Sequence, residues 1–289
     1  APAAADACAG KAEPRRGVTK SVKTGHRRAV ALLAGLLLAA ASPQDAAAWT
    51  DAGHRVVAQI ASEHLTPEAR RQVESLLQTQ GAASLPDISM LADIAKAVPL
   101  LEQPSHVVHM PLVDRPYDPA KDCRKGRCAL AALDSNVAIL GDPQASMASR
   151  AAALAMVVHL VGDLHQPLHT SADTGQRKVR WKGERMTLHA FWDDEITAAL
   201  GSDWQEIATE VGAKGCDDVA DSDPVVWAGE GRDIARDTIL ADPRVPKREA
   251  RDLPETYVSE AWPIARERLR LAGCRLAGLL NRILVGTGP

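Results

Sequence analysis

The helical spacing of the apolar residues is the feature that most constrains the fold of this chain of 289 residues. From Asp51 to Leu65, apolar side chains recur three or four positions apart, as on one face of a helix. Thr66 then stands at the N-cap position of a second helix, with Pro67 at its first position. The pattern predicts further helices at 87–98, 129–140, 145–164, 193–200, 204–211, 224–240 and 254–285.

Signals for β-strands are scarce. Val179–Trp181 and Met186–Leu188 flank a Lys-Gly-Glu turn and predict one short β-hairpin. Five prolines punctuate a loop that we expect to end near Arg127, and no internal repeat is found. We therefore predict an all-α fold, a single multi-helix domain with one short hairpin at residues 49–289.

Residues 1–48 have the composition of a targeting segment. The pair Arg27-Arg28 precedes the apolar run 29–41, and three alanines that end at Ala48 follow. This order predicts a secretory signal peptide; a buried N-terminal helix is the alternative. Cleavage after Ala48 would make Trp49 the first residue of a protein that is secreted or periplasmic.

The charge balance limits how the chain can bind an anion. Residues 49–289 carry 27 Lys/Arg and 34 Asp/Glu. This balance argues against a simple basic nucleic-acid clamp. An acidic protein that binds an anion needs a local source of positive charge, and bound metal is one such source.

Four cysteines remain after residue 48. Cys123 and Cys128 enclose a short polar loop and predict a local disulfide in an oxidising compartment. Cys216 and Cys274 are candidates for a second bridge that the sequence alone does not establish. Zinc binding by these cysteines is disfavoured because no second close Cys or His pair accompanies them.

One segment concentrates histidine and aspartate. His159 and Asp163 are four residues apart on a predicted helix and share one face, whereas His165 lies about 120° away. Pro167 ends the helix and allows His169 to return to the same volume. Imidazole with carboxylate is a ligand set suited to zinc.

A second pair with the same spacing strengthens this interpretation. His189 and Asp193 are also four residues apart, and His54, Asp93 and His106 lie upstream in apolar surroundings. One such pair alone is equally compatible with a structural hydrogen bond, and a lone histidine on an apolar helix is usually a core residue. Two pairs with a clustered third histidine favour a metal site.

The chain resembles a known family, the secreted zinc-dependent single-strand-specific nucleases and 3′-nucleotidases of fungi, plants and bacteria. The resemblance runs from Trp49 to about Leu284. It implies an all-α fold, related to that of bacterial zinc phospholipase C, with three zinc ions at the bottom of a cleft. The motifs that carry it are Trp49-x4-His54, Leu91-Ala-Asp93, Ser105-His106, His159-x3-Asp163-x-His-Gln-Pro-Leu-His169, and Trp181-Lys-Gly with Leu188-His189-x2-Trp-Asp193.

The resemblance implies a set of ligands for each zinc ion. The bridging ligand would be Asp163, shared by the first and third ions. Signal cleavage would create one ligand group, because an amine binds metal only when it is deprotonated and unblocked. The first ion would be held by Asp93, His106, His159 and Asp163; the second by His169, His189 and Asp193; the third by His54, Asp163 and the α-amino nitrogen and carbonyl oxygen of Trp49.

The same resemblance implies the chemistry. Asp93 would orient or deprotonate the attacking water as general base, and Lys96, three residues later, would lie near the phosphate; a solvated surface lysine is the alternative. The expected substrates are single-stranded DNA and RNA, cleaved to 5′-phosphorylated nucleotides, with additional 3′-nucleotidase activity on 3′-nucleotides. We expect no stable membrane association, since no apolar run reaches roughly 18 residues. We also expect a monomer.

The sequence departs from the family near the expected base-binding positions. Val107 and His109 replace an aromatic residue and an Asn or Asp, and Gly175-Gln176 replaces a longer glycine-rich run. These differences bear on base preference and not on the metal ligands. Trp181 and Trp192 are interpreted as core residues and not as base platforms.

Two other functions remain open at this stage. A phospholipase C-like phosphodiesterase could use the same zinc ligands, although no basic amphipathic surface helix supports a membrane-facing rim. A non-catalytic zinc-stabilised binding protein is disfavoured by the presence of both Asp93 and Lys96, because structural sites need no general base.

Overall fold

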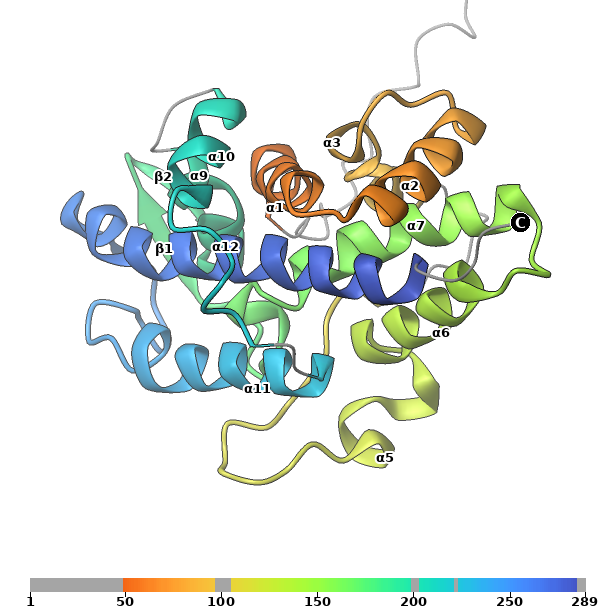
Figure 1. Ribbon diagram of the computed structural model, residues 1–289. Coiled ribbons are helices and arrows are strands. Elements are labelled where there is room, and N and C mark those ends of the chain that lie inside the picture. Colours follow the sequence, from red (N-terminus) through yellow and green to blue (C-terminus); the bar gives the residue numbers. More distant parts are fainter. Residues whose placement is uncertain (1–48, 97–104, 199–202, 221–222, 285–289) are drawn as a thin grey trace, which may run out of the picture. The chain divides into compact units, whose positions relative to one another are not determined.

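The computed structural model describes residues 49–96, 105–198, 203–220 and 223–284. The predicted signal peptide lies outside these residues. The predicted mainly helical domain is confirmed by the elements of the described part (Figure 1).

Three long helices build the core. Helix α1 (Asp51–Glu63) and helix α7 (Met147–Asp163) pack on each other, and helix α12 (Thr256–Leu284) packs on both (Figure 1). Gly273 in α12 allows the close approach of α1, because a Cβ there would lie 2.6 Å from the Cβ of Ile60. In α1 the apolar face predicted from the spacing is the buried one.

Shorter helices cover this core. Helix α2 (Pro67–Thr79) begins as predicted, with the Thr66 side chain accepting a hydrogen bond from the Ala69 amide (3.2 Å). Helix α6 (Ala129–Gly141) packs along α7. Helix α10 (Trp204–Gly212) packs on α1, and helix α11 (Pro224–Ile234) continues into the π-helical turn η4 (Ala235–Ile239).

The single helix predicted for 87–98 is wrong. The chain forms α3 (Leu85–Ile88) and α4 (Leu91–Lys96), separated by a turn. The carbonyl oxygen of Ser89, which a continuous helix would use internally, instead lies 2.8 Å from Nδ1 of His159. A contact with a distant side chain therefore breaks the helix that the periodicity predicts.

The predicted hairpin is confirmed, with strand bounds shifted by one or two residues and a third strand added. Strands β1 (Lys178–Trp181) and β2 (Glu184–Thr187) are antiparallel, and β3 (Arg251–Asp252) pairs with β1 in parallel. The loop has two residues with positive φ, Lys182 and Gly183, a backbone that matches the twist of a hairpin.

Two disulfides join parts of the described chain. Cys123–Cys128 closes the predicted polar loop, which also contains α5 (Pro119–Asp122) and the 3₁₀ turn η1 (Arg124–Gly126). Cys216–Cys274 ties the segment after α10 to α12 and settles the pairing left open by the sequence. None of the described helices is long and apolar enough to cross a membrane.

Candidate metal centre

Helix α7 supplies the central pair of side chains. His159 and Asp163 are fully buried one turn apart, with 3.3 Å between His159 Nε2 and Asp163 Oδ2. The Ala-rich helix is buried around most of its circumference, so both polar side chains point into protein. Burial of a carboxylate at this depth requires compensating positive charge or hydrogen bonds.

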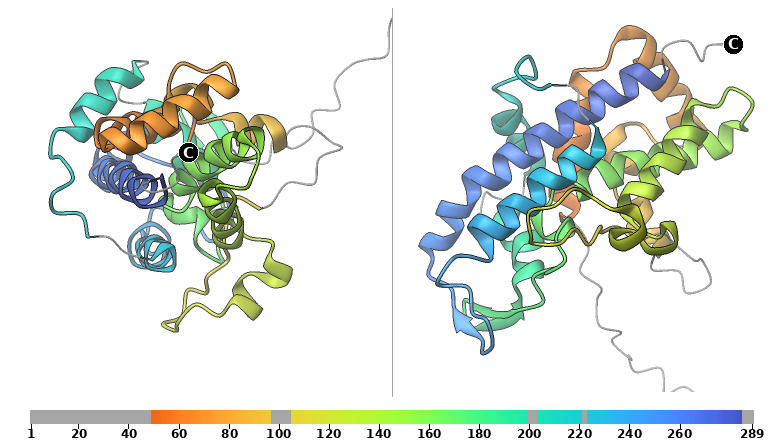
Figure 2. Two further views of the ribbon diagram at one scale, coloured as in Figure 1. Left: turned by 45° about the vertical axis from the view of Figure 1, so that its right-hand side comes forward. Right: turned by 90° about the horizontal axis from the view of Figure 1, so that it is seen from below.

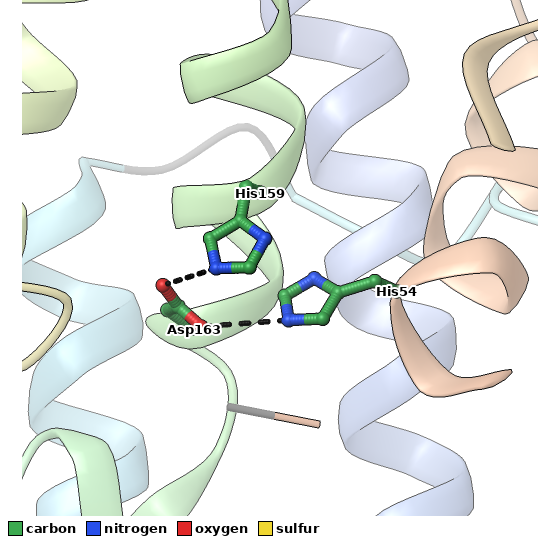
Figure 3. A group of neighbouring side chains, drawn as sticks. All are labelled: His54, His159 and Asp163. Carbon is green, nitrogen blue, oxygen red and sulfur yellow. Dashed lines mark ion pairs between the residues drawn. The ribbon is translucent and has the colours of Figure 1, made fainter. Parts of the chain in front are cut away.

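His54 reaches the same volume from α1. Its ring stacks on that of His159, with centroids 4.0 Å apart and planes 11° from parallel (Figure 3). His54 Nε2 lies 3.6 Å from Asp163 Oδ1. Gly162 makes room for this ring, because a Cβ at that position would lie 2.7 Å from His54 Nδ1.

A second group shares His159 and opens towards α4. Asp93 Oδ1 lies 3.2 Å from His106 Nδ1 and 3.5 Å from His159 Nε2. The two imidazole nitrogens, His106 Nδ1 and His159 Nε2, are 3.1 Å apart. Ligand atoms of Asp93, His106 and His159 are close enough to hold one ion.

The third group follows the 3₁₀ turn η2 (Pro167–His169), where the chain returns as predicted after the end of α7. His169 and His189 stack with centroids 4.7 Å apart, and His189 Nε2 lies 3.3 Å from Asp193 Oδ2. After the single turn α8 (Leu188–Ala190), Asp193 lies in the π-helical segment η3 (Phe191–Glu195), which continues into α9 (Ile196–Ala198). A single π-helical turn is often found at a functional site.

Backbone carbonyls fix the orientation of two imidazoles. His159 Nδ1 lies 2.8 Å from the Ser89 oxygen, and His189 Nδ1 lies 2.6 Å from the Thr174 oxygen. Because a carbonyl only accepts, each Nδ1 carries the proton and each Nε2 of a neutral ring presents its lone pair. This is how proteins orient histidine ligands of metals.

Buried polar atoms without a hydrogen-bond partner cluster at these groups in the described part of the chain. Such atoms are rare because leaving them without a partner costs free energy. A cation would satisfy the carboxylate oxygens and, in each imidazole, the one nitrogen that presents its lone pair. The atoms without a partner include both ring nitrogens of His54 and His169, both oxygens of Asp163, Asp93 Oδ2 and His106 Nε2.

Burial and the close approach of these imidazoles and carboxylates shift several of their pKa values. Burial and the neighbouring His159 lower the pKa of His54 well below 6.5, and burial lowers the pKa of His169 to about 4. Burial also lowers the pKa of His159, but the carboxylates of Asp163 and Asp93 outweigh it and raise that pKa to about 9. Burial raises the pKa of Asp163.

The structure brings eight of the ten sequence-predicted site residues into these groups. Trp49 is fully buried, and the amide of the next residue, Thr50, donates to the Asp193 carbonyl (3.2 Å), which places the start of α1 beside the third group. Lys96 is the last residue of α4, and its side chain lies outside the described part. His64 is the exposed C-cap of α1.

Sequence reasoning missed the residues that hold the ligands. Gln166 donates to Asp193 Oδ1 (2.6 Å) and accepts from the Leu168 amide, so it fixes both Asp193 and η2. Its place between His165 and Pro167 was the only signal. Trp181 and Trp192 are buried core residues, as predicted.

Comparison of the sequence with known protein families identifies the family of this chain. A model of the S1/P1 nuclease family matches residues 49–285. The chain belongs to the S1/P1 nuclease family.

Individual relatives agree. Endonuclease 2 of Arabidopsis thaliana is 28% identical over 266 residues, which cover 81% of this chain and 90% of the relative. Nuclease S1 of Aspergillus oryzae is 27% identical over 267 residues (81% and 91%), and nuclease P1 of Penicillium citrinum is 27% identical over 160 residues (53% and 59%). The family predicted from the motifs is confirmed, and the protein is a nuclease, a hydrolase of phosphodiester bonds.

Gly162→Ala tests the packing of the centre. The new methyl group must displace the His54 ring, and we expect a loss of about 1–3 kcal/mol of folding stability. We also expect an approximately 100-fold loss of nuclease activity from the misplaced ligand. The matched control is Gly278→Ala in α12, where a Cβ meets nothing within 4 Å; it should leave activity unchanged. Equal activity in both variants would contradict the close packing described for His54.

Proposed function

We propose that this nuclease is a trinuclear zinc phosphodiesterase that hydrolyses single-stranded DNA and RNA to 5′-phosphorylated nucleotides and also acts on 3′-nucleotides. The convergence of three groups of buried imidazoles and carboxylates is the observation that carries the proposal. Nitrogen and oxygen ligands in sets of three or four suit zinc. When bound, the zinc ions would supply Lewis-acid stabilisation of phosphate charge and a water of lowered pKa.

The proposed ligand sets use every residue of these groups. Asp163 has one oxygen towards His54 and His169 and the other towards His106 and His159, which fits a bridging role. We propose Asp93, His106, His159 and Asp163 for the first ion; His169, His189 and Asp193 for the second; and His54, Asp163 and the terminal nitrogen and carbonyl oxygen of Trp49 for the third.

Asp93 is the carboxylate that the reacting water would meet. Its side chain is 14% exposed, whereas that of Asp163 is 0% and that of Asp193 is 1% exposed. Burial raises its pKa, but hydrogen bonds from His106 and His159 outweigh burial and hold the pKa below its ordinary value. An ionised carboxylate at the edge of the centre would orient the water or accept its proton as general base. We place Lys96 near the phosphate, three residues further along α4; unchanged turnover of Lys96→Ala would remove this role alone.

The depth of the centre supports single-stranded substrates. The proposed ligand side chains are almost fully buried, so the scissile phosphodiester must enter a recess. A duplex is stiff over this length, whereas a single strand bends and its unstacked bases can pack against protein.

Cleavage after Ala48 would free the backbone nitrogen of Trp49 for metal binding. A peptide bond at Trp49 would block its nitrogen as a ligand, so residues 1–48 would act as a signal peptide whose removal completes the third site. Secretion or a periplasmic location also fits the two disulfides.

Metal analysis and hydrolysis assays on two forms of the protein test the proposal. Protein that starts at Trp49 should contain about three zinc ions per chain and cleave single-stranded DNA and RNA. Protein with Ala48 retained should lose about one zinc on dialysis and most of its activity. Full hydrolysis after removal of metal by a chelator would refute the metal centre, and equal zinc in both forms would refute the terminal ligand. Phosphatidylcholine serves as the alternative substrate, and preferential turnover of this lipid would contradict the nucleic-acid assignment.

A further inference from the structure

The small sheet carries a concentration of positive charge. Residues 176–187 and 242–252 together contain nine Lys/Arg and four Asp/Glu, whereas the rest of 49–289 contains 18 and 30. Because β3 pairs with β1, the two segments lie side by side near the Thr256 end of α12 (Figure 2). The charge of this end is opposite in sign to that of the rest of residues 49–289.

Three of the nine cations have carboxylate partners. Arg177 pairs with Asp173, Arg180 with Asp252, and Arg244 with both Asp242 and Glu260. The others are exposed and form no ion pair within the described residues. Three of these six residues lie on the strands and three in the adjoining turn and loop. We call the six side chains the cationic sheet: Lys178, Lys182, Arg185, Lys247, Arg248 and Arg251.

The strand register turns part of this charge outward at a cost. Val179 and Trp181 point inward and are buried, so Arg180 and Arg185, which lie opposite each other, share the outer face. Like charges at directly opposed positions destabilise a sheet. Asp252 offsets the charge of Arg180, but in the described part no carboxylate pairs with Arg185. A sheet that keeps such a pair is suited to a polyanionic partner.

The hairpin is continuous with the metal centre. Strand β2 ends at Thr187, two residues before His189. The Leu188 amide donates to the Arg177 carbonyl (2.8 Å), and the His189 amide donates to that of Gly175 (2.9 Å). The base of the hairpin is therefore fixed beside the third group of ligands, and the strands lead from there to the turn at Lys182 and Gly183.

The dimensions suit several nucleotides. Four residues of strand span about 13 Å, which is long enough to face more than one phosphate of an extended strand. At the far end, Lys182 lies over the Trp181 ring (5.4 Å from Nζ to the centroid). The loop that precedes β3 borders an open hollow of about 730 Å³, and its lining includes Lys247, Arg248 and Arg251.

We propose that the cationic sheet binds the backbone of the single strand on one side of the scissile phosphodiester. This inference rests on the proposed single-strand activity and adds a second contact region to it. An anionic membrane is the other partner that such a surface could fit. It is disfavoured because the large exposed apolar side chains of the described residues lie elsewhere, at Ile94, Val113, Ile139, Met147 and Val226.

Substrate length separates this surface from the catalytic centre. The test variant replaces four exposed cations by glutamine: K182Q, R185Q, K247Q and R248Q. A dinucleotide reaches only the centre, so its kcat/KM should change by less than twofold. For a 20-residue oligothymidylate at low salt, kcat/KM should fall by about tenfold or more. The slope of log kcat/KM against log salt should become shallower by up to about 3, since each phosphate contact contributes about 0.7.

A matched control removes four cations from another part of the surface: R71Q, K121Q, R124Q and K125Q. It has the same net charge change and should preserve both the long-substrate rate and the salt slope. Melting temperatures check that both variants are folded. Equal loss in the two variants, or loss on dinucleotide and oligomer alike, would overturn the proposal.

A binding measurement keeps this inference distinct from the proposed function. Fluorescence anisotropy of labelled oligothymidylate is compared in the full protein with and without the four substitutions, in an Asp163→Asn background. If the wild-type protein cleaves neither the dinucleotide nor the oligomer, the proposed function fails, while weaker binding by the four-fold variant still supports the surface. Equal oligomer binding, or loss only of binding to phosphatidylserine vesicles, overturns it.

Discussion

Asp163→Asn should lower kcat/KM of this nuclease by more than about 100-fold. Loss of a partner that merely supports a ligand typically costs 10- to 100-fold in metal affinity or activity. Asp163 lies among the ligands themselves, since its two oxygens face four imidazoles at 3.3 to 3.7 Å. Asparagine keeps the shape and removes the negative charge, so we expect lower metal retention after dialysis together with the loss of turnover.

Asp134→Asn is the control for this change. Asp134 is exposed on α6 and belongs to none of the metal-capable groups. Its substitution should leave kcat/KM and metal content at wild-type values. Metal content and activity near wild type in Asp163→Asn would contradict a bridging carboxylate and the proposed first and third sites.

The sequence predicts the helices that bury one continuous apolar face. Helices α1, α6 and α7 lie close to their predicted bounds, and α2 begins where predicted, because their apolar spacing is matched by their packing. The segment 87–98 fails because the carbonyl of Ser89 turns to His159, 70 positions away. Periodicity has no access to such a contact.

The sequence likewise reveals some parts of the metal-capable groups and not others. Pairs with i, i+4 spacing on α7 and around η3 are visible in the sequence, because helix geometry places them together. The support of these ligands is not visible. Gly162 is recognisable only from the position of the His54 ring, and the Thr174 carbonyl only from the fold of the segment before the hairpin.

His165 shows where the sequence argument stops. The helical spacing places it about 120° from the face that His159 and Asp163 share and indicates no partner for it. In the structure the His165 ring contacts helix α12, with 3.0 Å between His165 Nε2 and Arg275 Nη1. Arg268 Nε donates to its carbonyl oxygen (3.1 Å) from 103 positions away. The loop that leads to His169 is thus held from α12.

Glu230→Gln should be the most destabilising of the single substitutions proposed here. The Glu230 carboxylate accepts from Arg268 (2.7 Å) and from both terminal nitrogens of Arg275 (2.7 and 2.8 Å). These guanidinium side chains are only 3% and 7% exposed. Without the carboxylate, two buried cations face each other with no anion between them. Removing one member of a buried ion pair costs about 3–5 kcal/mol; because Glu230 is itself 36% exposed, we expect about 2–4 kcal/mol.

Denaturant unfolding of the disulfide-bonded protein measures this loss, with Glu210→Gln as the matched control. Glu210 pairs with Arg266 on the surface at 3.7 Å, with both side chains about half exposed, so its loss should cost less than about 1 kcal/mol. A similar small change in both variants would contradict a stabilising role for the Glu230 cluster.

The pH dependence distinguishes the charge of Glu230 from its shape. Burial raises the pKa of Glu230, but hydrogen bonds from Arg275 and Arg268 outweigh it and hold the pKa below the ordinary 4.5. A lowered pKa in the folded state contributes stability above the unfolded pKa, and this contribution is lost as pH falls through the folded value. The free energies of unfolding of wild type and Glu230→Gln should therefore differ by a constant amount above about pH 5 and converge below pH 4.5. A difference that persists unchanged to low pH would assign the effect to packing, and the loop before His169 would then owe its position to shape and not to the buried charge.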